Sequence, residues 1–326
     1  MRPVATGPIS KDDMSVSDSH DARRREIIAS HPEVRLLVGP CAQTALWVAP
    51  AVILQFAVAA FMASVPWWVV PIAAYLVGAF ATHALNVVIH ESAHDLVFRR
   101  PWQNRLCAIA ANLPAVVPSA MAFRHYHLLH HRFLGERRRD ADVALDWEAR
   151  LFGRGRFGKF MWLVLQPFTY AVIHPLQVRQ RMRIDFWAIA NLAVTVGAAV
   201  PVYWFFGLPA LVYLLLSTYF AVGLHPAGAH ILQEHIIFNG GRYETASYYG
   251  PVNRVSLNHG YHTEHHDFPG IAGPRLPALT RIAEGQYRTR FSHRSRVATL
   301  WQFIFDERIG IDSRVIHAGT GIAGDL

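Results

Sequence analysis

Histidines in three short clusters dominate the chemistry that this sequence can perform. The clusters are His90-Glu-Ser-Ala-His94, His127-Leu-Leu-His130-His131 and His262-Thr-Glu-His265-His266, and His235 stands alone before the last of them. On a helix, positions three and four residues apart share one face, so we expect each cluster to direct its imidazoles at a common point. Neutral imidazole is the commonest side-chain metal ligand and suits zinc, iron and copper. Eight or nine such ligands are too many for one ion, so the sequence predicts two metal ions.

Apolar runs of membrane length lie beside these clusters. They cover about residues 45–65, 67–89, 185–206 and 208–230, and the second leads directly to His90. Two shorter stretches, 106–123 and 160–173, contain proline or are too short to span, which predicts interfacial or re-entrant helices. We therefore expect an all-α integral membrane protein with four transmembrane helices, interfacial helices and a cytoplasmic histidine-rich di-metal cap.

Positive charge indicates how the spans are oriented. The net charge is +8, and the basic residues fill the N-terminus, the segment 91–183 and the C-terminus while avoiding both short hairpins. By the positive-inside rule, these three regions lie in the cytoplasm. The prediction is a multi-pass protein with both termini and every histidine cluster on the cytoplasmic side. The membrane would be the inner membrane of a bacterium or the endoplasmic reticulum of a eukaryote.

The remaining composition divides the chain into three regions. Residues 1–20 are polar, which predicts disorder. Residues 21–44 contain an amphipathic segment that is interrupted at Pro32 and is expected to lie at the membrane interface. Residues 45–326 are expected to form a single membrane domain. Cys41 and Cys107 are too few for a disulfide framework or an iron–sulfur cluster, which predicts apolar packing positions for both.

Two other classes of protein compete for the histidine clusters. His90-Glu91-Ser-Ala-His94 matches the zinc-protease pattern His-Glu-x-x-His, in which the glutamate is the general base. A protease would need one further ligand and would leave both His-x-x-His-His clusters unexplained. A metal transporter or sensor is the other alternative. Transport sites usually lie near the bilayer midplane, whereas these clusters lie where the apolar runs end.

Residues near the clusters receive supporting roles. The acidic neighbours are expected to orient the far nitrogens of the imidazoles: Glu91, Glu234, Glu264 and Asp267. Histidines in or near the ends of the spans are candidates either for orienting ligands or for structural contacts: His83, His225 and His230. His125 and His259 are expected not to be ligands. The isolated histidines are expected to be solvated or locally hydrogen-bonded: His20, His31, His174, His293 and His317.

The clusters resemble the three histidine boxes of the membrane fatty-acid desaturase and hydroxylase superfamily. Over about residues 20–315 the chain is similar to the sphingolipid Δ4-desaturases, or dihydroceramide desaturases. The stretches that carry this similarity include Phe123-Arg-His-Tyr-His-Leu-Leu-His-His-Arg-Phe-Leu-Gly135, Glu244-Thr-Ala-Ser-Tyr-Tyr-Gly-Pro251 and Gly260-Tyr-His-Thr-Glu-His-His-Asp-Phe-Pro269. The chain departs from the family at Asp95, where asparagine is usual, and at Leu129, where an acidic residue is usual.

The resemblance implies a non-haem di-iron centre with O2 as co-substrate. The implied iron ligands are His90, His94, His127, His130, His131, His262, His265 and His266, with His235 as an additional ligand. No catalytic residue beyond these ligands and no further cofactor site is expected. The implied reaction is Δ4 desaturation of a dihydroceramide-type lipid, and a C4-hydroxylase or a fatty-acyl desaturase or hydroxylase are the alternatives. The chain carries no flavin, nicotinamide or iron–sulfur motif, which predicts a separate electron donor such as cytochrome b5 or a ferredoxin with its reductase. No nucleic-acid partner is expected.

Overall fold

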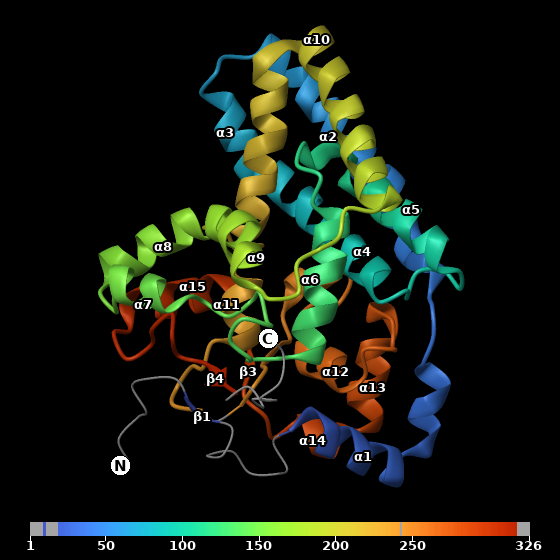
Figure 1. The fold of residues 1–326 in the computed structure, drawn as a ribbon, viewed down its shortest axis with the longest axis vertical. Helices are drawn as coiled ribbons and strands as arrows, with labels where there is room; N and C mark the ends of the chain where they lie inside the picture. Colours follow the sequence, from blue (N-terminus) through green and yellow to red (C-terminus); the bar gives the residue numbers. More distant parts are fainter. Residues whose placement is uncertain (1–8, 11–18, 242, 318–326) are drawn as a thin grey trace.

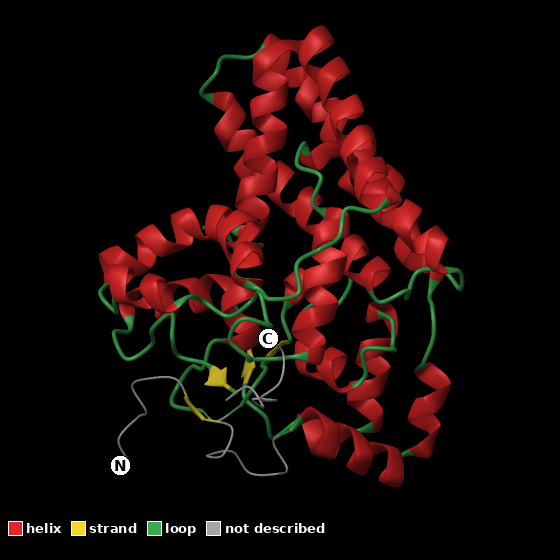
Figure 2. Cartoon of the chain, viewed as in Figure 1, coloured by secondary structure: helices red, strands yellow, loops and turns green. Residues whose placement is uncertain are grey.

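The computed structural model describes residues 9–10, 19–241 and 243–317, and these residues are mostly helical (Figure 2). The helices are α1 His20–Ser30, α2 Val48–Phe61, α3 Val69–Ala73, α4 Ala79–Ala93, α5 Pro101–Asn112, α6 Ala120–Arg132, α7 Asp146–Phe152, α8 Arg156–Phe168, α9 His174–Gln177, α10 Phe186–Val222, α11 His230–His235, α12 His262–Asp267, α13 Leu276–Ile282, α14 Glu284–Tyr287 and α15 Arg296–Phe305. The strands are β1 Ile9–Ser10, β2 Ser247–Tyr248, β3 Ser292–His293 and β4 Val315–Ile316, paired in parallel as β1 with β4 and β2 with β3. Most of the segment predicted to be disordered, residues 1–20, lies outside the described residues.

Three helical stretches of the described chain are long and apolar enough to cross a membrane. They are Ala42–Ser64, Val69–Ala93 and Phe186–Val222. Within the third, Gly207 has φ 73° and ψ −171°, a left-handed conformation that glycine adopts without steric penalty. The chain reverses there, and Figure 1 shows α10 as two arms joined at the top. These two arms coincide with the predicted third and fourth apolar runs. The fourth was predicted to reach residue 230, which is wrong because α10 ends at Val222.

The first of the shorter apolar stretches folds into a bent pair of helices. Residues Pro101–Ala115 and Ala120–Arg132 meet at 118°, a geometry that fits the predicted re-entrant arrangement and equally a broken span. Asn112 stabilises the bend because its Oδ1 accepts hydrogen bonds from the backbone N–H groups of Ser119 and Ala120. Helix α6 begins in the apolar core, where Ala120 and Met121 pack with residues of α4, and runs from there out of the apolar layer. As a result, the histidines near its C-terminus lie outside the apolar layer.

The apolar helices pack around α4. Of the stretch that ends in α4, 61% is buried, compared with 22% for each of the other two, so α4 is the central helix. The outward faces of α2 and α10 expose large apolar side chains, such as Phe61, Trp204 and Phe205. An apolar outer surface of this kind suits contact with lipid. Buried hydrogen bonds connect the helices, because Gln55 of α2 donates to the carbonyl of Gly78 and accepts from Tyr213 of α10.

Helices α1 and α11 to α14 lie in a cap at one end of the apolar layer. In Figure 1 the turn of α10 and the loop between α2 and α3 lie at the top, and α11, α12 and α13 lie in the lower half. The N-terminal segment belongs to this cap, because Ile27 and Val34 pack in one cluster with Ile271 and Leu279. Helix α1 ends at Ser30 and a 3-10 turn begins at Pro32, so the predicted interruption at Pro32 is confirmed.

Candidate metal centre

Four short segments bring the predicted histidines together at the boundary between the apolar helices and the cap. His90 lies in the last turn of α4 and His94 directly follows that helix. The second cluster occupies the C-terminal half of α6, His235 ends α11, and the third cluster lies in α12. All nine histidines fall into two neighbouring groups.

Group one contains five histidines from three elements: His90, His94, His127, His131 and His265. One ring nitrogen from each lies within 4.8 Å of those of the other four, a separation that could accommodate a metal ion. The Nε2 atoms of His94 and His127 lie 3.0 Å apart, and those of His131 and His265 lie 3.1 Å apart. The group therefore presents converging nitrogens from distant parts of the chain.

Group two lies beside it and contains His130, His235 and His266, whose ring nitrogens also lie within 4.8 Å of one another. His262 adjoins this group, with its Nε2 atom 3.1 Å from Nε2 of His235. The rings of His131 and His266 stack at 4.2 Å between centroids, so the two groups are in direct contact. The expectation that each sequence cluster converges on one point is wrong, because both His-x-x-His-His clusters contribute to both groups.

Unpaired nitrogens indicate that these groups fit metal ions. Nε2 of His90, of His130 and of His266 is buried and has no hydrogen-bond partner among the described residues. A buried polar atom without a partner is costly, and a metal ion bound between the rings would remove that cost. The donor set is all imidazole, which suits iron. The residues present therefore fit two metal ions of the type that the sequence predicts.

Burial keeps the cap histidines in the form that binds metal. It lowers the pKa of His235, His262, His265 and His266 well below the usual value, and neighbouring imidazoles lower it further. Imidazole must be neutral to bind a metal ion. Burial and the neighbouring imidazoles therefore favour the neutral form of these four side chains.

In two histidines of group two, the ring nitrogen that points away from the group is hydrogen-bonded to a carboxylate or to a backbone carbonyl. Nδ1 of His130 lies 2.9 Å from Oδ1 of Asp140, and both side chains are fully buried. Although burial opposes ionisation, His130 and Arg314 hold the pKa of Asp140 well below its usual range. Nδ1 of His235 donates to the carbonyl of Glu244 at 3.2 Å. In each case the remaining Nε2 is directed into group two, which is how supporting residues orient metal-binding histidines.

The acidic neighbours expected to orient imidazoles have different partners. Oε1 of Glu91 lies 3.4 Å from Nδ1 of His90, and Oε1 of Glu234 lies 3.7 Å from Nδ1 of His262, so these two lie near the rings that they were expected to orient but form no hydrogen bond with those nitrogens. For the other two the expectation is wrong. Glu264 accepts hydrogen bonds from the hydroxyls of three residues outside the groups: Ser247, Tyr249 and Thr280. Asp267 bonds to Arg23 and Tyr287 instead of a ligand ring. Glu264 and Asp267 therefore hold helix α12 as a whole rather than a single imidazole.

Helix α1 is attached to α12 by a buried ion pair. Nε and Nη2 of Arg23 each donate to a different oxygen of Asp267, both at 2.6 Å. Arg23 is 3% exposed and Asp267 is 1% exposed, and Tyr287 also donates to this carboxylate at 3.0 Å. Asp267 directly follows His266, and the ring of His20 lies 5.1 Å from that of His266. The N-terminal segment thus covers group two and restrains the helix that carries three of the nine histidines.

The histidines outside the two groups have identifiable partners. His125 contacts the carbonyl of Gln180 at 2.8 Å, away from both groups. His259 lies beside group one, with its ring 4.9 Å from that of His90. His83 accepts a hydrogen bond from the buried guanidinium of Arg296 at 3.1 Å. His174 was expected to be solvated or locally hydrogen-bonded, but it is buried against Glu148, 26 residues away, whereas His293 does bond locally, to Thr299.

Asp140 and Arg23 are supporting residues that the sequence did not single out. Asp140 comes ten residues after His130 and follows a run of three arginines, a pattern typical of a solvated loop. Arg23 lies in a similarly basic run. The only available signal for Asp140 was its position shortly after a histidine cluster. Nothing in the spacing connected Arg23 with Asp267.

Comparisons with known proteins extend over nearly the whole chain. The family model for fatty acid desaturases matches residues 66–296, and the model for the sphingolipid Delta4-desaturase matches residues 16–43. The sphingolipid delta(4)-desaturase DES1 of Drosophila melanogaster is 38% identical over 94% of this chain and 95% of its own length. The DES1-like protein of Oryza sativa subsp. japonica is 38% identical over 91% and 90% of the two chains. The sphingolipid delta(4)-desaturase/C4-monooxygenase DES2 of Bos taurus is 39% identical over 91% of each.

Proposed function

Because this chain belongs to the fatty acid desaturase family, and within it to the sphingolipid Δ4-desaturases, we propose that it introduces the Δ4 double bond into a dihydroceramide-type lipid. The single observation that carries the proposal is the gathering of nine buried or partly buried histidines from four segments into two adjacent groups. A protease using only His90 and His94 would not require the second group. The family is one of oxidoreductases, and the relatives' printed names give the sphingolipid substrate and the position of the double bond.

The proposed ligands divide between two iron ions as the histidines do. Group one would hold one ion through His90, His94, His127, His131 and His265. Group two would hold the other through His130, His235, His262 and His266. Bound iron supplies the O2-dependent removal of hydrogen from an unactivated alkyl chain, chemistry that no acidic, basic or nucleophilic side chain provides.

The protein's own residues orient the ligands and admit the substrate. Asp140 and the carbonyl of Glu244 hold His130 and His235 with Nε2 directed inward. Helix α4 ends at His90 and His94 of group one, so an alkyl chain that enters between the apolar helices and follows α4 would approach group one. Burial of the groups excludes bulk water from the reacting carbons. The cap would then face the cytoplasm, with both chain termini on that side.

Electrons would come from another protein. Each turnover needs electrons from outside, and we propose a separate donor such as cytochrome b5 or a ferredoxin with its reductase. This follows from the absence of a flavin, nicotinamide or iron–sulfur motif in the sequence. The donor would approach the cytoplasmic face of the cap.

Lipid analysis of cells expressing the chain tests the proposal. Cells fed labelled dihydroceramide should accumulate a product lighter by two hydrogens, and purified protein should contain about two iron ions per chain and little zinc. His265→Ala should reduce product formation by more than about 100-fold and lower bound iron, because a supporting residue alone is typically worth about 10–100-fold. His125→Ala is the matched control, since His125 lies outside both groups, and it should behave as the wild type.

Three other results would change the proposed reaction, metal or substrate. A product heavier by one oxygen would identify C4 hydroxylation, the second activity in the name of the bovine relative. Zinc at one ion per chain with full activity in His265→Ala would refute the di-iron proposal. Turnover of fatty acyl lipids in place of dihydroceramide would refute the proposed substrate while leaving the metal assignment in place.

A further inference from the structure

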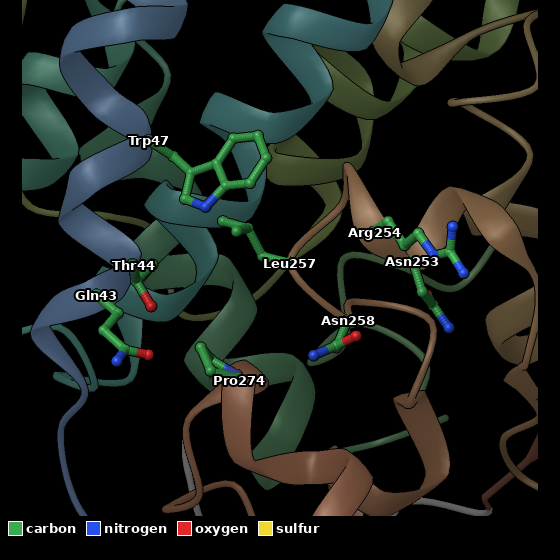
Figure 3. A pocket seen from close by; sticks show the side chains of 8 residues that line it. All are labelled: Gln43, Thr44, Trp47, Asn253, Arg254, Leu257, Asn258 and Pro274. Carbon is green, nitrogen blue, oxygen red and sulfur yellow. The ribbon is translucent and has the colours of Figure 1, made fainter.

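A cavity opens between the start of the first apolar stretch and the loop before the third histidine cluster. Its volume is about 350 Å³. Figure 3 shows Thr44 and Gln43 on one side, Asn258 and Arg254 on the other, and Trp47 with Leu257 between them. The cavity therefore joins segments that are more than two hundred residues apart. None of its lining residues belongs to the two histidine groups.

Thr44 provides the first sign that this cavity binds a polar ligand. Its side chain is 0% exposed, and its Oγ1 has no hydrogen-bond partner among the described residues. Leaving a buried hydroxyl unpaired costs about 1–3 kcal/mol. A ligand bound in the cavity would supply the hydrogen bond that the Thr44 hydroxyl lacks within the described residues.

The other polar groups of the lining are mainly uncharged donors and acceptors. Gln43 is exposed at the rim, and Asn258 uses its Nδ2 to donate to the carbonyl of Gly273 at 3.2 Å, which leaves its Oδ1 directed elsewhere. Arg254 is the one charged side chain of the lining. Trp47 and Leu257 supply apolar surface beside these groups. Such a lining is complementary to a small head that carries hydroxyl and amide groups and is attached to an apolar chain.

Residues of the cavity wall adjoin residues that contact group one. Asn258 precedes His259, whose ring lies 4.9 Å from the ring of His90. Pro274 follows Gly273, whose N–H donates at 2.8 Å to Glu91, the neighbour of His90. Leu257 packs in one apolar cluster with Val88 and Ile89, which precede His90 on α4. The wall of the cavity is thus built from residues that adjoin, in sequence or by packing, the residues in contact with His90 and Glu91.

The position of the cavity suits a ligand that resides in a membrane. Trp47 lies in the first turns of the apolar stretch Ala42–Ser64, and its neighbour Leu46 is 72% exposed. Tryptophan at the end of an apolar helix typically marks the depth of the lipid headgroups. A lipid whose chains remain in the bilayer could therefore place its head here without leaving the membrane.

We propose that this cavity holds the amide-and-hydroxyl head of a sphingoid lipid, with Thr44, Gln43 and Asn258 bonding its polar groups. The proposal rests on the proposed function and deepens it. In a sphingoid base the head comprises the first three carbons, so the carbons of a Δ4 double bond follow it immediately. The head must then be bound next to the metal centre. A cavity lined by Asn258 and Pro274, the neighbours of His259 and Gly273, lies on the side of the cap that adjoins group one and so suits that requirement.

Replacing Thr44 tests the site directly. Thr44→Val keeps the shape and removes the hydroxyl, and the KM for dihydroceramide should rise roughly 5-fold while kcat and iron content stay within about twofold, the effect of losing one hydrogen bond. Gln43→Leu should act in the same direction. Thr44→Ser retains the hydroxyl and should restore most of the affinity. Thr169→Val is the matched control, because Thr169 is also buried but bonds to the carbonyl of Gln166 in its own helix.

A binding measurement separates this site from the proposed reaction. Labelled dihydroceramide and labelled diacylglycerol, which lacks the amide, are bound to the purified iron-loaded protein in lipid nanodiscs, where no electron donor is present. Weaker binding of dihydroceramide alone by Thr44→Val supports the site whatever the product of turnover proves to be. Equal binding by wild type and Thr44→Val overturns the site and leaves the reaction standing. Failure of the wild type to bind dihydroceramide overturns both.

Discussion

At the scale of single residues, helix geometry explains how neighbouring histidines serve different groups. Adjacent residues on a helix point about 100° apart, whereas residues four apart nearly coincide in direction. His127 and His131 therefore both face group one, and His130 between them faces group two. In α12 the same rule sends His262 and His266 towards group two and His265 towards group one. The His-x-x-His-His spacing is thus suited to ligands shared between two adjacent sites.

Asp140 is the residue whose replacement should separate orientation from ligation. Asp140→Asn keeps the size of the side chain but removes the charge that holds His130, so we expect iron retention and activity to fall about 10–100-fold. The measurement is iron per chain after dialysis against a chelator, together with the rate of product formation. Asp146→Asn is the control, since Asp146 is exposed and pairs with Arg137 on the surface. Unchanged iron retention in Asp140→Asn would contradict the orienting role.

At the scale of elements, the shortest helices carry the most critical residues. Helices α11 and α12 have six residues each, and helices of this length are not stable on their own. Their positions depend on surrounding contacts, such as the hydrogen bonds from Ser247 and Thr280 to Glu264. The long apolar helices need no such support. Their length and composition alone favour insertion into a bilayer.

Helices α7, α8 and α9 are joined through the buried carboxylate of Glu148. It accepts from Trp162 Nε1 at 3.1 Å and lies 2.8 Å from Nε2 of His174. Although burial opposes ionisation, the hydrogen bond with His174 lowers the pKa of Glu148. Glu148→Gln should therefore destabilise the protein at neutral pH by about 1–3 kcal/mol, measured as a lower Tm in detergent.

The same pair predicts a pH dependence whose sign follows from the lowered pKa. A carboxylate with a depressed folded-state pKa stabilises the protein above its unfolded value, about 4.3, and that stabilisation disappears as the pH falls below it. The wild type should therefore lose more Tm on acidification than Glu148→Gln. Glu284→Gln, which removes an exposed carboxylate that pairs with Arg288, should track the wild type within about 0.5 kcal/mol. Parallel acid profiles for all three proteins would refute the prediction.

At the scale of the whole molecule, the chain closes on itself at the metal centre. The ion pair between Arg23 and Asp267 joins residues 244 positions apart and attaches the N-terminal helix to the helix of the third cluster. A buried charge pair that loses one partner leaves the other uncompensated. The N-terminal segment is therefore part of the support of group two, although it contributes no predicted ligand.

Arg23→Met should destabilise the protein by about 1–3 kcal/mol and lower the iron bound per chain, because the buried carboxylate of Asp267 would lose two charge-assisted hydrogen bonds and keep only its contacts with His20 and Tyr287. Arg23→Lys should rescue only in part, since lysine cannot donate to both oxygens in the same geometry. Arg24→Met is the control on the same helix, because Arg24 is exposed. Thermal unfolding and metal analysis measure the effect. Wild-type values for both in Arg23→Met would show that the pair does not support group two.

Local patterns in the sequence determined the class of protein and the candidate ligands. Apolar runs of membrane length and histidines at helical spacing depend only on residues close together in the chain, so they are legible without coordinates. The division of nine histidines into two groups, the bonding of Asp140 to His130, the attachment of Arg23 to Asp267 and the cavity beside Thr44 were decided by tertiary structure. Each depends on contacts between segments separated by loops and helices of unpredictable direction, and no spacing within one segment records which distant residue will complete its hydrogen bonds.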